Sequence, residues 1–211
     1  WEEGGYTWKD KPHPRGELWV GGNNIAIGYY KNPQKTREDF HEVKGLRWFS
    51  TGDIGEIQAD GCVKIVDRKK DLVKLQAGEY VSLGKVETAL KMSPLVDNIC
   101  VYADPSKMFT VCLVVPNAKA LHALADKLKV PNGDDWTTLC DNKDIEKAIL
   151  KALQEQGMKS KVERFELPQR LTLVREIWTP DSGLVTDAFK LKRRELQKHY
   201  ENEINRMYTK G

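Results

Sequence analysis

Residues 45–71 of the chain read GLRWFSTGDIGEIQADGCVKIVDRKKD, and the fold prediction starts from this stretch. Trp48–Ser50, Ile54–Gln58 and Cys62–Val66 are short runs containing aromatic and β-branched residues, and they predict three strands. Ala59-Asp60-Gly61 separates the last two, and Asp-Gly accommodates the positive φ values that a tight hairpin turn requires. Because a dense run of charges ends the stretch, we expect a domain boundary there.

The residues before this stretch also predict β-structure, with one short helix. Glu17–Val20 follows a Pro/Gly turn and ends at Gly21-Gly22, which is typical of a short strand. Asn32 is placed to cap a helix that runs to about Phe40, with Pro33 in its first turn.

The residues after this stretch predict a mixture of helices and strands. Ser82 is placed to cap one helix, and Ile145, Ile149 and Leu153 form the apolar stripe of another. Predicted helices cover Leu83–Lys91, Asn117–Lys129, Lys143–Gln156 and Asp187–Tyr208, and predicted strands cover Asn98–Tyr102, Phe109–Val115 and Leu171–Val174. Pro131–Asp134 breaks the second of these helices. The predicted fold class is α+β with a β-rich front.

Composition sets limits on the function. The chain has 211 residues, of which 40% are hydrophobic and 31% charged, so it is long enough for one sizeable domain or two small ones. A net charge of +3 is too balanced to indicate a nucleic-acid or membrane surface. The longest mostly apolar run, Met108–Val115, is 8 residues long. A membrane-spanning helix needs about 20 residues, so we expect no membrane span.

The cysteines predict neither a metal site nor a disulfide framework. Cys62, Cys100, Cys112 and Cys140 are separated by 38, 12 and 28 residues, and no pair has zinc or redox spacing. Reduced thiols, and hence an intracellular protein, are the better interpretation. Because the chain begins at Trp1 and not at Met, we expect it to be part of a longer polypeptide.

Three polar clusters could carry chemistry. Ser50–Asp53 lies at a predicted strand end, where Gly52 would let the backbone approach a ligand. Asp67–Lys74 has four cations and two anions in eight residues and is followed by Gly78. Phe189–Arg194 is a basic segment near a helix start. By spacing alone, a structural turn or a solvated charged surface is the favoured interpretation of each cluster.

Taken together and in order, the clusters resemble the motifs of the adenylate-forming ligases, specifically the long-chain acyl-CoA synthetases of animal type. The segments that carry the resemblance are 16–18, 28–30, 45–56, 60–71, 74–82, 161–166 and 178–194. They cover essentially the whole chain. One departure is Leu46–Ser50, where the family often has Asp-Gly-Trp-Leu/Phe-His/Arg.

The resemblance implies an enzyme that activates long-chain fatty acids with ATP and then forms acyl-CoA, releasing pyrophosphate and AMP. It implies that residues 1–68 are the β-rich C-terminal end of a large AMP-binding domain. Residues 69–211 would be a small mobile α+β lid domain. The substrates would be a fatty acid, ATP and CoA, with Mg²⁺ held in a missing upstream domain. This chain would contain no metal site and would be inactive alone.

The resemblance also assigns roles in adenylation to three residues. Asp53 would accept hydrogen bonds from both ribose hydroxyls of ATP, and Arg68 would add a second ribose contact. Lys190 would be the adenylation lysine, whose ammonium bridges the carboxylate and the phosphate oxygens. Placing a positive charge where negative charge accumulates lowers the barrier of such a transfer.

The remaining assignments concern the second step and the lid. Lys70 falls where the family places its hinge, so the lid would rotate there between the two steps. Gly78 would leave space for the pantetheine arm of CoA, and Lys74 would be a further contact in this step. For Glu87 the favoured interpretation is a packing or salt-bridge residue.

A second hypothesis is a stand-alone, non-catalytic module that binds nucleotide, CoA or a partner protein. The family resemblance further implies that the parent enzyme lies on the cytosolic face of the endoplasmic reticulum or the mitochondrial outer membrane. We expect no nucleic-acid partner.

Overall fold

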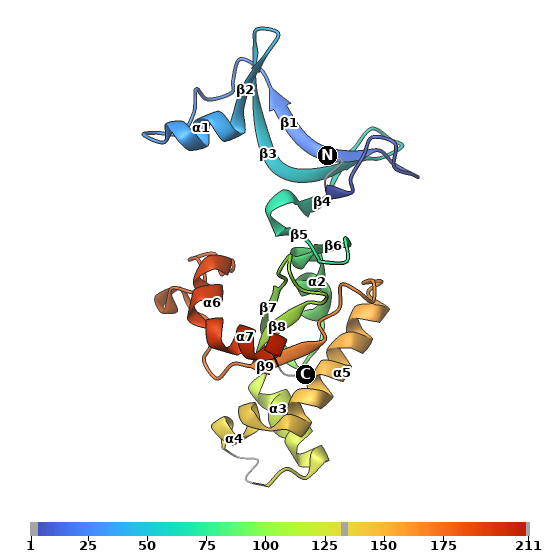
Figure 1. The fold of residues 1–211 in the computed structure, drawn as a ribbon, viewed down its shortest axis with the longest axis vertical. Helices are drawn as coiled ribbons and strands as arrows, with labels where there is room; N and C mark the ends of the chain where they lie inside the picture. The colour runs from blue at the N-terminus through green and yellow to red at the C-terminus, as the bar shows by residue number, and fades with distance from the viewer. Residues whose placement is uncertain (1–3, 132–134, 210–211) are drawn as a thin grey trace. The chain divides into compact units, whose positions relative to one another are not determined.

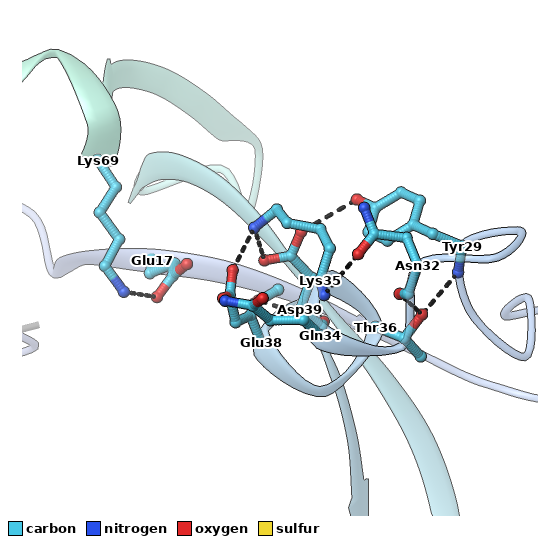
Figure 2. A network of polar contacts seen from close by, with 10 residues as sticks. Glu17, Tyr29, Asn32, Gln34, Lys35, Thr36, Glu38, Asp39 and Lys69 are labelled. Atoms are coloured by element: carbon cyan, nitrogen blue, oxygen red, sulfur yellow. Dashed lines mark hydrogen bonds and ion pairs between the residues drawn. The ribbon is translucent and has the colours of Figure 1, made fainter.

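The computed structural model describes residues 4–131 and 135–209 (Figure 1). It is a mixed α+β structure, which confirms the predicted fold class. The chain divides into two compact units, Trp1–Leu72 and Val73–Gly211. The predicted boundary lay at 68/69, whereas the structure assigns the short 3₁₀ helix η2 (Lys69–Asp71) to the first unit. There the Lys69 Nζ atom lies 3.0 Å from Glu17 Oε2 (Figure 2).

The first unit is built on one antiparallel sheet of four strands. Its long strand β3 (Leu46–Ile57) pairs with β1 (Arg15–Gly21), β2 (Phe40–Val43) and β4 (Val63–Arg68). The predicted strands in this region are present, but the prediction of two separate strands at Trp48–Ser50 and Ile54–Gln58 is wrong. They form one continuous strand, and the Ser50–Asp53 cluster lies inside it and not at its end.

The strand continues through this cluster because of a bulge. The β1–β3 register shifts between Glu17 and Trp19, where Gly52 has a φ of 73°. The Thr51 hydroxyl donates to the Leu18 carbonyl at 2.9 Å and accepts from the Asp53 N–H at 3.1 Å. These side-chain bonds replace the missing ladder bonds, so the strand bends without ending.

The helix α1 (Pro33–Asp39) begins as predicted, with Asn32 Oδ1 accepting from the Lys35 N–H at 3.1 Å. Lys35 Nζ lies 2.8 Å from Asp39 Oδ1 (Figure 2). Burial of the Asp39 carboxyl opposes ionisation, but the hydrogen bonds from Lys35 and Tyr29 outweigh it and lower the pKa of Asp39. This network joins the end of the helix to the loop that precedes it.

The second unit contains a sheet of three strands covered on both faces. β7 (Val96–Tyr102) and β8 (Val111–Pro116) are antiparallel, and β9 (Arg170–Leu173) is parallel to β8. Every residue of β8 is buried, as expected of a central strand that has no solvent-exposed face.

Helices cover the two faces of this sheet (Figure 1). One face packs on α2 (Leu83–Leu90), α3 (Ala118–Leu128), α4 (Trp136–Asp141) and α5 (Lys143–Lys159). The other packs on Trp178 and on two C-terminal helices, α6 (Arg193–His199) and α7 (Glu201–Thr209). No helix in the described ranges combines the length and apolar content that a bilayer span requires.

The C-terminal prediction needs the largest correction. A single helix over Asp187–Tyr208 is wrong, because residues 184–192 form a hairpin and Tyr200 separates α6 from α7. Residues at the base of the hairpin, Leu184 and Val185, are buried in the core, which fixes them in an extended conformation. Sequence analysis also missed β2, α4 and the ribbon formed by β5 (Leu72–Lys74) and β6 (Tyr80–Ser82). The predicted break at Pro131–Asp134 lies largely outside the described residues.

The predicted Ser82 cap of the second unit is confirmed, and further caps are found at Asn117 and Asn142. Ser82 Oγ accepts from the Lys85 N–H at 3.3 Å, and Asn117 Oδ1 from the Ala120 N–H at 3.0 Å. Asn142 both ends α4 and caps α5, since its Oδ1 atom accepts from the Asp144 and Ile145 N–H groups.

We predict that Asn142→Ala lowers the free energy of unfolding by about 1 kcal/mol, because two N–H groups at the start of α5 lose their acceptor. Asn142→Asp is the matched control, since it keeps an acceptor and adds a favourable charge at the helix N-terminus. Urea denaturation followed by circular dichroism measures both. Equal stability of the Ala and Asp variants would contradict the assigned cap.

Candidate functional site

Asp53 and Arg68 lie opposite each other on neighbouring strands. They are register partners in the β3–β4 pairing, and Arg68 Nε lies 3.4 Å from Asp53 Oδ1. Their side chains are 37% and 60% exposed. An exposed pair at this distance is weakly held, so the carboxylate oxygens stay available to accept hydrogen bonds from hydroxyl groups. The pairing thus brings two predicted site residues together.

Lys70 is the middle residue of η2, and its side chain is exposed. The Leu72 N–H donates to the Lys69 carbonyl and closes this short helical turn. Lys70 is therefore two residues before the division between the units, in a segment held by local hydrogen bonds.

Gly78 lies in the turn of the β5–β6 ribbon, with a φ of 100°. A β-carbon at this position would contact nothing within 4 Å, so the backbone conformation, and not lack of space, requires glycine. The Gln76 N–H donates to the Lys107 carbonyl at 3.0 Å and ties the turn to the loop between β7 and β8. Lys74 Nζ lies 5.3 Å from the centroid of the Tyr80 ring, a cation–π contact on the same ribbon.

Lys190 lies in a hairpin turn and not on a helix. The Thr186 N–H donates to the Lys190 carbonyl at 2.8 Å, and the Phe189 N–H donates to the Thr186 carbonyl at 2.7 Å. The Lys190 N–H lies 3.2 Å from Thr186 Oγ1. These bonds fix the backbone of Lys190 and leave its side chain exposed to solvent.

The stem of this hairpin is anchored in the core. The Lys192 N–H donates to the Leu184 carbonyl at 3.0 Å, and Val185 forms a β-bridge with Leu191. Leu184 and Val185 are 4% and 0% exposed. The hairpin therefore presents an exposed lysine from a buried base.

The same pair of hydrogen bonds closes the turns at 58–62, 75–79 and 186–190. In each, the first N–H donates to the fifth carbonyl and the fourth N–H to the first carbonyl. The fourth residue then takes a left-handed conformation. The residues in that position are Gly61, Gly78 and Phe189, with φ values of 85°, 100° and 55°. Phe189 is thus the residue in these turns with a strained backbone, and its ring is 61% exposed. This strain was not predicted from the sequence.

The prediction that Glu87 is a salt-bridge residue is confirmed. Its carboxylate is almost completely buried and forms an ion pair with Arg193.

The cysteine thiols and the potential metal ligands do not form a further reactive site in the described residues. Burial raises the pKa of the Cys112 thiol and, for Cys140, raises it to about 11, so neither forms a reactive thiolate at neutral pH. None of the four cysteines forms a disulfide. The described part of the chain contains no group of three His, Cys, Asp or Glu side chains suited to a metal ion.

Each unit contains a hollow among its described residues. A cavity of about 320 Å³ in the second unit has Arg175, Glu176 and Arg206 in its wall. A hollow of about 610 Å³ in the first unit surrounds Ile27–Arg37. The predicted site residues line neither of them.

No protein-family model matches the chain. It is 49% identical over 210 residues to long chain acyl-CoA synthetase 8 of Arabidopsis thaliana, covering 99% of this chain and 29% of that protein. It is 38% identical to long-chain-fatty-acid–CoA ligase 1 of Schizosaccharomyces pombe over 209 residues, covering 99% of this chain and 30% of that protein. The chain is a homologue of part of the long-chain acyl-CoA synthetases.

Solved structures agree with this homology. The A domain of carboxylic acid reductase from Segniliparus rugosus, in complex with AMP and a co-purified carboxylic acid, matches with a TM-score of 0.84 and 30% identity. The adenylation domain of a carboxylate reductase from Mycobacterium chelonae matches with a TM-score of 0.82 and 32% identity. Each match covers 99% of this synthetase homologue and 30% of the solved chain.

The synthetase homologue therefore spans about 30% of the length of the curated relatives it matches. The two relatives named come from a plant and a yeast, so they support the family and not its animal-type subdivision.

We predict that Phe189→Gly raises the free energy of unfolding of the synthetase homologue by roughly 1 kcal/mol, because glycine adopts the left-handed conformation without steric cost. The exposed ring contributes little burial. Phe189→Ala is the control, since it removes the ring and keeps the strain. Thermal denaturation distinguishes them, and a stabilised Ala variant would show that the ring and not the backbone is responsible.

Proposed function

We propose that this chain is the C-terminal part of a long-chain fatty-acid:CoA ligase, inactive when separated from the rest of the enzyme. The observation that carries the proposal is the 49% identity over 210 residues to a long chain acyl-CoA synthetase. The AMP bound in one solved neighbour supports adenylate chemistry. The residues Trp1–Leu72 would end the large AMP-binding domain, and Val73–Gly211 would form the lid.

In the first step, a fatty-acid carboxylate oxygen attacks the α-phosphorus of ATP, the bond to the β-phosphate oxygen breaks, and pyrophosphate leaves. Asp53 accepts hydrogen bonds from the ribose hydroxyls, and Arg68 provides a second ribose contact. The Lys190 ammonium neutralises the charge shared by the carboxylate and the phosphate. Its exposure on a hairpin turn supports this role, since a lysine within a packed core could not reach a substrate.

In the second step, the sulfur of CoA attacks the carbonyl carbon of the acyl-adenylate, the carbon–oxygen bond to the phosphate breaks, and AMP leaves. The thiol proton passes to solvent in the same step. Between steps the lid rotates about Lys70. The open space around Gly78 supports a passage for the pantetheine arm, and Lys74 on the same ribbon would contact CoA.

The remainder of the ligase would lie in the rest of the polypeptide. It would contain the acyl-binding tunnel and the ligands for Mg²⁺, for which the described residues offer no cluster. Attachment to the cytosolic face of the endoplasmic reticulum or the mitochondrial outer membrane also belongs to this proposal, and fractionation of cells that express the tagged enzyme tests it.

We predict that Lys190→Ala in the full-length enzyme lowers the rate of acyl-adenylate formation by about 10²–10³-fold, the usual cost of one charge-stabilising contact. Thioester formation from supplied acyl-adenylate stays largely intact, because Lys190 leaves the site before that step. Pyrophosphate release measures the first step and acyl-CoA the second. Lys192→Ala, two residues away and also exposed, is the matched control. Equal loss of both steps in Lys190→Ala would overturn its role.

We predict that Lys70→Pro restricts the lid to one orientation, because proline fixes φ near about −65°. A 3₁₀ turn has a similar φ, so proline matches the backbone angle expected at the middle position of η2. One step should slow by about tenfold or more while the other continues. Lys70→Ala, which keeps backbone freedom, should run both steps. Normal rates for both steps in the Pro variant would refute the hinge.

A further inference from the structure

Glu87 forms a two-pronged ion pair with Arg193. Arg193 Nη1 lies 2.7 Å from Glu87 Oε1, and Nη2 lies 2.8 Å from Oε2. Glu87 Oε1 also accepts from the Val101 N–H at 2.8 Å. The guanidinium in turn lies 3.4 Å from the Val101 carbonyl. The parallel bonds fix direction as well as distance, so α2, β7 and the start of α6 are held at one point.

The ion pair, and not a side-chain cap, anchors the start of α6. Arg193 is the first residue of α6, and its N-cap residue Lys192 makes no side-chain capping bond. The Lys192 N–H instead closes the hairpin on Leu184. The last residue of the hairpin stem, Lys192, is therefore followed directly by the first residue of α6, Arg193. Glu87 anchors this junction through its ion pair with Arg193.

Lys190 depends on this junction for its position. It stands three residues before Arg193, in the turn of the hairpin. In the part of the chain that the structure describes, its side chain makes no hydrogen bond or ion pair that would place the ammonium. Its location is therefore set by the backbone alone.

We propose that the Glu87–Arg193 pair is a positioning device for the adenylation lysine, an inference that rests on the proposed function. Neither residue touches the substrate. The pair fixes the start of α6 and the end of the hairpin, so the Lys190 ammonium meets the reacting oxygens at the right distance. A misplacement of about 1 Å in such a site costs about 10²-fold in rate.

A purely structural role is the competing explanation, and α2 supplies a matched control. Lys85 on the same helix pairs with Glu166, with its Nζ atom 2.6 Å from Glu166 Oε2. Glu166 is 4% exposed and Glu87 is 7% exposed. Glu166 also accepts one backbone N–H, from Glu163 at 3.0 Å. The two carboxylates thus have similar burial and similar partners, but the Glu166 pair does not join the hairpin.

The experiment uses the full-length enzyme with Glu87→Gln, Arg193→Lys and Glu166→Gln, each alone and combined with Lys190→Ala. Pyrophosphate release measures adenylation, acyl-CoA formation from supplied acyl-adenylate measures the second step, and thermal denaturation measures stability. Arg193→Lys keeps the positive charge and removes the two parallel hydrogen bonds of the guanidinium. It therefore tests the orientation of the α6 start with the smallest loss of stability.

We expect Glu87→Gln and Arg193→Lys to lower the kcat of adenylation by roughly 10–100-fold, while the KM for ATP and the second step change little. Glu166→Gln should destabilise the protein comparably and leave adenylation within about twofold. With Lys190→Ala present, the Glu87 and Arg193 variants should cause no further loss, because both act through the lysine.

Two results would overturn the inference, and they distinguish failure of the positioning role from failure of the proposed role of Lys190. If Lys190→Ala abolishes adenylation but the Glu87 and Glu166 variants behave alike, the positioning role fails and the proposed function stands. If Lys190→Ala leaves adenylation unchanged, the role of the lysine in the proposed function fails, and the positioning role fails with it.

Discussion

Glu87 is an acidic side chain among apolar core residues, and a buried carboxylate persists only when its oxygens are paired. Arg193 and the Val101 N–H supply those partners. Because they come from β7 and α6, this one requirement decides where α6 begins against the sheet. The hairpin that carries Lys190 ends at the same point, so the exposed candidate site of the second unit depends on a charge buried beneath it.

The second constraint on the structure is the left-handed backbone conformation that three of the hairpin turns require. A turn closed by the bonds found at 58–62, 75–79 and 186–190 needs one residue in the left-handed region. Gly61 and Gly78 meet this requirement without strain, whereas Phe189 meets it with a side chain. A strained residue next to Lys190 fits the tendency of functional sites to hold conformations that the surrounding structure must stabilise.

Much of the local structure could be predicted from the sequence, because caps and turns depend on near neighbours. Asn32 and Ser82 each accept from a backbone N–H three residues on, so both caps could be predicted from the local sequence. The joining of two strands through Thr51 was not, since its hydroxyl bonds to Leu18, 33 residues away. The predicted C-terminal helix failed for the same reason: the apolar residues of 184–192 serve a β-bridge in the core.

The sequence by itself determined the α+β class, the family resemblance and the identity of the candidate residues, since these reside in composition and in ordered motifs. Only the tertiary structure decided that Asp53 faces Arg68 across two strands, that Lys190 stands on a hairpin, and that Arg193 is bound to Glu87. The physical reason is that strand register and ion pairing join residues far apart in the chain. Glu87 and Arg193 are 106 positions apart, a separation at which no local pattern specifies a partner.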